Sequence, residues 1–214
     1  MLQLDPSASI VLEILDTGGK TVEKMDLYDG NKRPLGKTIG RQEKTGPGTY
    51  TLMVHGLLIN DSGQVLSQKR VETKAHWPGL WDLSCSGAVK AGETSQEALS
   101  REVKEELGLD LNLKTTAPIL TASYQQGLSD YYLIPCSVDL AGLQIAKDEI
   151  QNVQWLDLAD LFAYLDQGRF VPYQKSFLQA LFDIYQAGSE ILPDWQLSQE
   201  TILFLNSLNY NRFI

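Results

Sequence analysis

An acidic stretch in the middle of the chain has the residue types and the spacing for metal chemistry. Residues 87–109 read GAVKAGETSQEALSREVKEELGL and hold five glutamates beside one arginine and two lysines. Three of these glutamates, Glu102, Glu105 and Glu106, fall within five residues, although the whole chain already carries a formal net charge of −9. Mg²⁺ takes oxygen ligands from a few carboxylates and leaves other positions to water and substrate phosphates. The cluster therefore indicates a divalent cation site.

A helix is expected to position these acids. Residues 94–97, Thr-Ser-Gln-Glu, have the form of a capping box, which predicts a helix start, and Gly108 is a natural C-cap. At 100° per residue, one side of this helix is apolar and is expected to face a sheet through Ala98, Leu99, Val103 and Leu107. The three glutamates lie in an arc beside that side. Glu102 and Glu106 then form a like-charge i,i+4 pair, which costs roughly 0.2–0.5 kcal/mol in isolation.

The loop ahead of the helix is suited to a close approach between backbone and ligand. Glycines at 87 and 92 flank it, where a strand is expected to hand over to the helix, and a backbone carbonyl there can join a metal shell. From Gly87 to Leu109 the residues resemble the Nudix box, GX5EX7REUXEEXGU, without a departure. The resemblance implies an α/β/α sandwich with a mixed β-sheet. It also implies an Mg²⁺- or Mn²⁺-dependent attack of water on a diphosphate that is linked to another moiety.

The resemblance implies which residues hold the metal. Glu105 and Glu106 would be the principal ligands. Glu102 would be either a further ligand or the general base. The backbone carbonyl of Ser86, just before the first glycine of the box, would complete the shell.

Further members of the site follow from the same resemblance. Arg101 would orient its neighbouring glutamate through a salt bridge, and Glu93 would support the loop. Some members of the family take one more carboxylate from a loop just before the strand that closes the sheet. Asp148-Glu149 stands at that place, six residues ahead of Trp155, and Glu149 is the favoured candidate for a ligand or general base.

Composition and charge exclude several classes of protein. The hydrophobic fraction of 43% and the charged fraction of 21% are typical of a soluble globular protein, and no apolar run reaches the length of a membrane span. The acidic balance argues against binding a nucleic-acid polymer. The N-terminus has no basic region ahead of its apolar run and does not resemble a signal peptide. Cys85 and Cys136 lie in apolar runs and are expected to be free thiols, so we expect a cytoplasmic protein.

Hydrophobic patterning predicts strands interrupted by helices. Residues 22–40 are expected to form a hairpin around the turn signal Asp29-Gly30-Asn31, and a subdomain boundary is expected near Gly48. Residues 172–188 have apolar side chains at helical spacing, and a last helix is expected around 198–208. Between the hairpin and these helices, strands are expected at 50–60, 64–70, 80–89, 118–124, 130–140 and 153–158.

The chain is thus expected to have three parts. Residues 1–48 would be an N-terminal extension with the hairpin, 49–188 the Nudix hydrolase domain, and 189–214 a C-terminal helical tail. The tail is amphipathic enough to cover a face of the core or of a partner subunit, and the second arrangement would make the protein a homodimer.

Beyond the box, the chain is similar to the branch of the family that includes isopentenyl-diphosphate isomerase and its hydrolase-like relatives. The similarity covers about residues 22–185 and includes the segment WPGLW at 77–81. The isomerase has a catalytic cysteine after this segment, followed within two residues by a metal-binding histidine. Ser86 and Ala88 stand at those places, and Cys85 is one position off, which turns a strand side chain to the other face. With all box glutamates present, hydrolysis is the favoured activity over isomerisation.

Residues outside the box are expected to contact the substrate. Arg70 and Lys74 match basic positions that the isomerase uses to hold its diphosphate; the alternative is that they are solvated loop charges. Trp77 and Trp81 either stack on a nucleobase or anchor the WPGLW segment in the fold. Both histidines of the chain are expected to be structural or solvent-exposed.

The substrate expected from these features is a nucleoside diphosphate derivative or a related small diphosphate. The N-terminal hairpin and loops such as 123–130 would recognise its organic part. A third interpretation is a non-catalytic module that binds a nucleotide as a regulator, although such proteins usually lack some of the box carboxylates.

Overall fold

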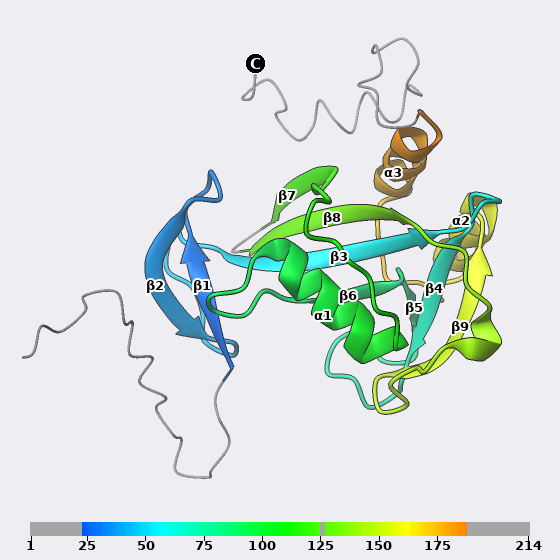
Figure 1. Cartoon of the computed structure of the whole chain (residues 1–214), viewed down its shortest axis with the longest axis horizontal. Helices are drawn as coiled ribbons and strands as arrows, with labels where there is room; N and C mark the ends of the chain where they lie inside the picture. Colours follow the sequence, from blue (N-terminus) through cyan, green and yellow to red (C-terminus); the bar gives the residue numbers. More distant parts are fainter. Residues whose placement is uncertain (1–22, 125–126, 188–214) are drawn as a thin grey trace, which may run out of the picture.

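A seven-stranded mixed sheet forms the centre of the computed structural model, which describes residues 23–124 and 127–187. Its strand order is β5-β4-β3-β8-β7, with β6 paired to β3 and β9 paired to β4 (Figure 1). The strands are β3 (Thr51–Ile59), β4 (Val65–Arg70), β5 (Trp81–Asp82), β6 (Cys85–Ala88), β7 (Leu120–Tyr124), β8 (Gly127–Pro135) and β9 (Ile150–Leu156). β3 and β8 run parallel, and the other pairs are antiparallel. The predicted mixed sheet is confirmed.

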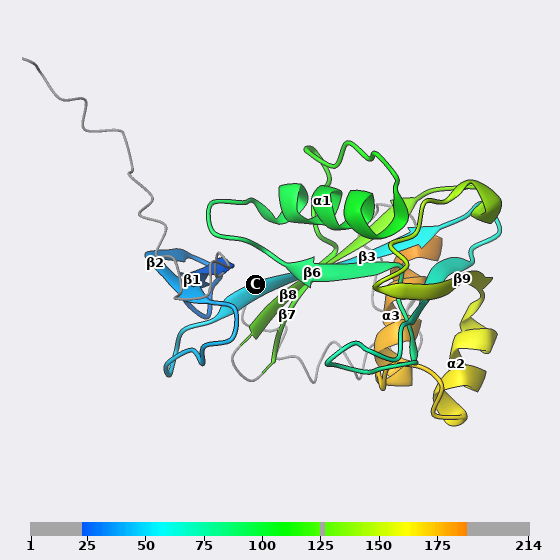
Figure 2. The same ribbon diagram turned by 90° about the horizontal axis from the view of Figure 1, so that it is seen from below.

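Helices cover both faces of this sheet. Figure 2 shows α1 (Ser95–Leu107) on one side and α2 (Leu158–Asp166) with α3 (Lys175–Ala187) on the other. Successive side chains of β3 point to opposite faces, so Leu58 packs in the cluster under α1 while Leu57 packs in the cluster under α2 and α3. A short 3₁₀ turn, η1, spans Leu140–Gly142. This arrangement is the α/β/α sandwich predicted from the sequence.

The helix α1 begins and ends where its caps predict. The Thr94 hydroxyl accepts a hydrogen bond from the Glu97 backbone N–H, and the Glu97 carboxylate accepts one from the Thr94 N–H. Gly108 ends the helix in the left-handed conformation, with φ of 72°. Capping of this kind stabilises a helix by about 1 kcal/mol. The helix packs closely on β3 at Gly56. A Cβ at this position would lie 3.1 Å from a methyl group of Leu99, which is closer than ordinary van der Waals contact.

The N-terminal hairpin forms a separate two-stranded sheet beside the glycine loop that precedes α1. It consists of β1 (Lys24–Tyr28) and β2 (Pro34–Gly40), as predicted. The Ala91 N–H donates to the Lys24 carbonyl at 2.8 Å, and Tyr28 and Tyr50 exchange two backbone hydrogen bonds. The hairpin is therefore attached both to the main sheet and to the loop that carries the candidate site.

Three expectations need correction. The single strand predicted at 80–89 is divided into β5 and β6. Residues 123–130 were expected to be a recognition loop, but β7 continues to Tyr124 and β8 begins at Gly127, so most of this segment is paired strand. The segment 153–158 was expected to be a strand throughout, whereas β9 ends at Leu156 and the next residue caps the unpredicted helix α2.

Some expectations fall outside the part of the chain that the structure describes. These are the character of the first 22 residues, the helix at 198–208, and the tail at 189–214 with its possible partner surface. Within the described ranges, no helix has the length and apolar character needed to cross a membrane.

Candidate active site

Arg101 connects the box helix to the loop before it. Its Nε and Nη2 donate to the two carboxylate oxygens of Glu93 at 2.8 and 3.0 Å, and Nη2 also donates to the Ala88 carbonyl at 3.0 Å. Its Nη1 donates to Glu102 at 2.6 Å and to Glu105 at 3.2 Å. One guanidinium therefore holds three carboxylates of the box, Glu93 from the loop and Glu102 and Glu105 from the helix.

Glu93 braces the loop, as its place in the box implies. Its carboxylate accepts a hydrogen bond from the Lys90 backbone N–H at 3.0 Å in addition to the two from Arg101. Burial raises the pKa of Glu93, but the hydrogen bonds from Arg101 and Lys90 outweigh it and hold the pKa below its usual value. Glu93 is therefore charged and accepts hydrogen bonds both from the loop, through Lys90, and from α1, through Arg101.

Gly87 provides the space that the Glu102 carboxylate occupies. A Cβ at this position would lie 1.9 Å from Oε1 of Glu102 and 2.0 Å from its Cδ. The neighbouring Ser86 lines the open cleft. Cys85 is fully buried in the cluster under α1, so the one-residue offset turns the thiol away from the cleft, as predicted.

Glu106 is the most buried carboxylate of the box, with 5% of its surface exposed. Its Oε2 accepts one hydrogen bond, from Nε2 of Gln68 at 3.0 Å. Burial, followed by the charges of Glu102 and Glu149, raises the pKa of Glu106 to about 8. Burial also raises the pKa of Glu102, against the opposing effect of Arg101. Crowded, buried carboxylates of this kind are stabilised in their charged form when a divalent cation binds between them.

Glu149 adds a carboxylate from outside the box to the acidic site. It directly precedes β9, as expected for a carboxylate ahead of the strand that closes the sheet. A hollow of about 250 Å³ is lined by Glu102, Glu105, Glu106, Ala146, Asp148 and Glu149. Nζ of Lys74 lies 2.6 Å from Oε2 of Glu149. The structure thus brings together five carboxylates that the sequence separates by as many as 47 positions, from 102 to 149.

The hollow opens into a larger cleft of about 850 Å³. The box carboxylates lie at one part of its wall, and cationic side chains line other parts: Arg41, Arg70, Lys74, Lys90 and Arg101. Met53, Trp77, Tyr124, Val171 and Tyr173 add apolar and aromatic surface. The cleft therefore combines an acidic centre, basic flanks and an aromatic wall, which suits a small anionic molecule with an organic part.

Four observations bear on whether the acidic centre fits Mg²⁺ or Mn²⁺. All the side-chain donors are carboxylate oxygens, which hard divalent cations prefer. Gly87 leaves room for one of them, and burial together with the charges of Glu102 and Glu149 raises the pKa of Glu106, so a cation there would offset an unfavourable negative charge. Within the described ranges, however, no three His, Cys, Asp or Glu side chains are already arranged to hold a metal ion. The carboxylate oxygens fit the cation in their chemistry, and they are not gathered around one point as placed.

The structure separates the two tryptophans of the WPGLW segment. Trp81 is 5% exposed and packs in the cluster under α2 and α3, so its interpretation as an anchor is confirmed. Trp77 differs: it is 49% exposed, lines the cleft and has a positive φ of 52°, so its stacking role stays a prediction. A bulky residue in this backbone region is strained, and such strain concentrates at functional sites.

Arg70 and Lys74 both line the cleft and have partners within the chain. Nε of Arg70 donates to the His76 carbonyl at 3.0 Å, and Nη1 lies 3.5 Å from Asp82. Neither residue is a freely solvated loop charge. His55 is structural: its ring stacks on Tyr131 at 4.6 Å between centroids, and burial lowers its pKa to about 4.

Sequence reasoning missed several residues of the cleft. Arg41 and Lys90 both pair with Glu23, at 2.5 and 3.5 Å, and these three residues come from the hairpin and the glycine loop. Tyr124 and Tyr173 were missed as well. No motif marks these positions, because they come together only when the hairpin and the α2–α3 layer pack against the sheet.

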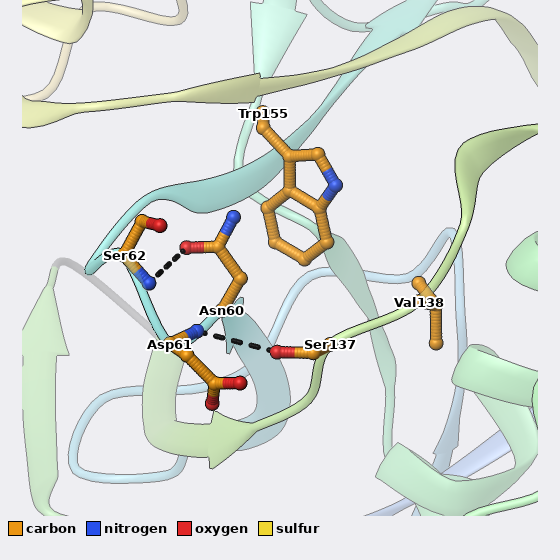
Figure 3. A pocket seen from close by; sticks show the side chains of 6 residues that line it. All are labelled: Asn60, Asp61, Ser62, Ser137, Val138 and Trp155. Carbon is orange, nitrogen blue, oxygen red and sulfur yellow. Dashed lines mark hydrogen bonds between the residues drawn. The ribbon is translucent and has the colours of Figure 1, made fainter.

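A second hollow, of about 350 Å³, lies at the turn between β3 and β4 (Figure 3). It is lined by Asn60, Asp61, Ser62, Ser137, Val138 and Trp155. The Ser62 N–H donates to the Asn60 side chain at 3.0 Å, and the Asp61 N–H donates to the Ser137 hydroxyl at 3.2 Å. Asp61 is the one acid in its lining, so this hollow has no carboxylate cluster comparable to that on α1.

The fold and the box together define a Nudix-type domain: a mixed sheet between helical layers, with the acidic helix α1 over one face. Comparison with a family model agrees, because the NUDIX domain model matches residues 49–181. The chain belongs to the Nudix family.

The relatives with which the chain is compared are consistent with this family. It is 39% identical to an uncharacterized Nudix hydrolase of Listeria monocytogenes over 166 residues, which cover 78% of this chain and 97% of that protein. It is 28% identical to an isopentenyl-diphosphate Delta-isomerase of an Enterobacter species, over 61% of this chain and 76% of that one. Among solved structures, DR0079 from Deinococcus radiodurans has the same fold, with a TM-score of 0.58 and 24% identity over 70% of this chain and 92% of that one.

Proposed function

We propose that the protein hydrolyses the diphosphate linkage of a nucleoside diphosphate derivative or a related small molecule, with Mg²⁺ or Mn²⁺ as cofactor. The observation that carries the proposal is the grouping of the α1 carboxylates with Glu149 around one hollow, at the edge of a cleft with basic flanks. Membership of the Nudix family supports the reaction type. The carboxylates of the hollow would hold divalent cations, whose charge would make this acidic surface able to bind a diphosphate.

Four groups of the chain would hold the cation: the side chains of Glu102, Glu105 and Glu106 and the backbone carbonyl of Ser86. A bound cation neutralises phosphate charge and lowers the pKa of a coordinated water. Arg101 supports this set because it fixes two of the three carboxylates through one Nη1 atom. The third carboxylate, that of Glu106, accepts a hydrogen bond from the side chain of Gln68.

We assign the proton-accepting role to Glu149 in preference to Glu102. The Glu102 carboxylate is fixed at 2.6 Å from Arg101 and fills the space at Gly87, which suits a metal ligand. The Glu149 side chain is 40% exposed on the opposite wall, where an attacking water can reach it. Loss of a general base typically lowers turnover by about 10²–10⁴-fold. Glu149→Gln is therefore expected to lower kcat, while Glu102→Gln is expected to weaken cation binding.

The substrate would span the cleft from the acidic centre to its aromatic wall. Arg70 and Lys74 are placed to contact phosphate oxygens, and Trp77 offers an exposed ring on which a planar group can stack. Arg41 and Lys90, on the hairpin side, are placed to contact a further anionic group.

The alternative to hydrolysis is the isomerase activity after which some relatives are named. That activity would require a cysteine in the cleft. The two cysteines of the chain are Cys85, which is fully buried against the core of α1, and Cys136, which follows β8. Ser86 occupies the cleft position that the isomerase fills with its cysteine. This placement supports hydrolysis over proton transfer on an isoprenoid. Because both thiols are free, we also propose a reducing, cytoplasmic location.

The test is product release with Mg²⁺ across a panel of nucleoside di- and triphosphates, nucleotide sugars, dinucleotides and isopentenyl diphosphate. Glu105→Gln and Glu106→Gln are the active-site variants, and Glu43→Gln, at an exposed position in the turn that follows β2, is the charge-matched control. We expect cation-dependent hydrolysis of one class, which both active-site variants abolish and the control retains. Conversion of isopentenyl diphosphate to its isomer would overturn the proposal. Tight nucleotide binding without turnover would identify a regulatory module instead.

A further inference from the structure

Four of the five carboxylates that line the acidic hollow are paired with a hydrogen-bond donor from the same chain. Arg101 binds Glu102 and Glu105, and Gln68 binds Glu106. Glu149 is paired with the ammonium group of Lys74 at 2.6 Å. The paired carboxylate oxygens therefore point toward these donors and are not gathered around one point. A divalent cation that binds here therefore meets carboxylates that already have partners, and it competes with the positive charge of Arg101 and Lys74.

Lys74 is the partner best placed to leave. It lies in the connection between β4 and β5, whose backbone is held beside Glu149 because the Val71 N–H donates to the Glu149 carbonyl at 3.1 Å. The Lys74 N–H in turn donates to the Val71 carbonyl at 3.3 Å. The backbone is thus fixed while the ammonium group is carried by a flexible four-carbon stem. Arg101 differs, because its guanidinium is fixed by five hydrogen bonds to four groups.

The ammonium group also acts on the centre of the hollow. It pairs with Glu149, which lines the hollow together with Glu106, the most buried of the carboxylates. Lys74 further lines the larger cleft in which phosphate groups are expected. One side chain therefore reaches both the cation site and the space beside it.

We propose that Lys74 is a displaceable counter-ion: it neutralises Glu149 in the free enzyme, is displaced when the divalent cation binds, and then contacts a substrate phosphate. This inference rests on the proposed function of the cleft. Lys74 is a positioning residue for Glu149 before substrate arrives, and its release frees that carboxylate to accept a proton. Its charge opposes cation binding when substrate is absent and favours substrate binding once the cation is in place.

The first test is a titration of the full chain with Mn²⁺ alone, in which the concentration of free ion is measured by electron paramagnetic resonance. Lys74→Met removes the charge and keeps most of the stem. Lys175→Met, which removes a lysine paired with Asp166 in the opposite helical layer, is the charge-matched control. Removing a positive charge a few ångströms from the cation is expected to tighten Mn²⁺ binding by about five-fold, whereas the control changes it by less than about two-fold.

A double-mutant cycle identifies the ion pair as the cause. In the Glu149→Gln background, Lys74→Met is expected to change Mn²⁺ affinity by less than about two-fold, because without the Glu149 carboxylate the ammonium group is no longer held beside the cation site. Equal effects of Lys74→Met in both backgrounds, or no tightening beyond that of Lys175→Met, would overturn the inference. If the wild-type chain binds no Mn²⁺ at all, the proposed function itself fails, and the two failures are thereby distinguished.

A second measurement tests the proposed contact between Lys74 and a substrate phosphate. With Mn²⁺ saturating, inorganic pyrophosphate is expected to bind Lys74→Met about ten-fold more weakly than the wild type. Lys74→Arg, which keeps the charge, is expected to recover most of this affinity. Unchanged pyrophosphate affinity in Lys74→Met would contradict the transfer of the ammonium group to phosphate.

Discussion

Lys32, in the turn of the N-terminal hairpin, forms an ion pair with Asp130, whose side chain is fully buried in β8. The carboxylate also accepts hydrogen bonds from the hydroxyl groups of Ser95 at 2.5 Å and Thr121 at 2.6 Å. Ser95 is the first residue of α1, and Thr121 lies opposite Asp130 in β7. One buried carboxylate therefore joins the hairpin, the box helix and two strands of the sheet, so the position of the hairpin beside the cleft depends on it.

Lys32→Met is expected to destabilise the protein by about 2–3 kcal/mol, because it leaves a buried carboxylate with hydroxyl donors alone. Urea denaturation measures this change, with Lys37→Met, an exposed lysine of β2, as the control. Lys32→Met/Asp130→Asn is expected to recover part of the loss, since the amide removes the unpaired charge. Equal stability of Lys32→Met and the wild type would show that the ion pair does not anchor the hairpin.

Gly87→Ala is expected to impair the cation site more than the fold. Its new methyl group would overlap the Glu102 carboxylate, which must then leave its place beside Arg101. We expect Mn²⁺ affinity and hydrolysis to fall at least about ten-fold, the size of effect typical for residues that orient a metal ligand. Gly142→Ala, where a Cβ meets nothing within 4 Å, is the control. Normal Mn²⁺ binding by Gly87→Ala would remove Glu102 from the ligand set.

The two tryptophans of the WPGLW segment are expected to respond differently to substitution. Trp81→Ala creates a cavity in the core and should lower the free energy of unfolding by about 3–5 kcal/mol. Trp77→Ala removes an exposed ring and should leave stability within about 1 kcal/mol of the wild type while it raises the KM for the preferred substrate several-fold. Thermal melting and steady-state kinetics separate the two effects. A large loss of stability in Trp77→Ala with unchanged KM would restore its anchoring role.

His55 is expected to make the protein less stable in mild acid. Burial lowers its pKa to about 4 from an ordinary value of 6.5, against the opposing charge of Asp130. Between these pH values the unfolded chain binds a proton that the folded chain does not, so stability falls as the pH falls, by at most about 3 kcal/mol. The difference in unfolding free energy between wild type and His55→Gln, measured by urea denaturation from pH 7 to pH 4, isolates this contribution from that of the carboxylates. A difference that stays constant with pH would contradict it.

Local sequence patterns predicted the elements that contain their own signals. The capping box at Thr94 and the glycine at 108 gave both ends of α1, and the box spacing placed its carboxylates beside the sheet. The helix α2 was missed because apolar residues stand on both sides of Asp157, so the apolar pattern extends the predicted strand to the start of the helix. The Asp157 side chain nevertheless accepts a hydrogen bond from the Asp160 N–H and caps the helix. Period alone does not separate a strand from a helix over so short a run.

Long-range pairings account for what the sequence did not predict. Lys74 and Glu149 are 75 positions apart, and Lys32 and Asp130 are 98 apart, so no local pattern connects either pair. The different exposure of Trp77 and Trp81 depends on the pairing of β5 with β4, which buries the second ring. These contacts are set by the packing of distant elements, and they decide how the acidic centre is balanced by basic side chains.

The most direct test of the acidic centre is anomalous diffraction from crystals soaked with Mn²⁺ and methylene diphosphonate, an analogue that resists hydrolysis. We predict manganese density bounded by the Ser86 carbonyl and the carboxylates of Glu102, Glu105 and Glu106, with the diphosphonate bridging it to the basic wall of the cleft. Manganese density away from these carboxylates, or diphosphonate bound in the cleft without a metal, would contradict the account.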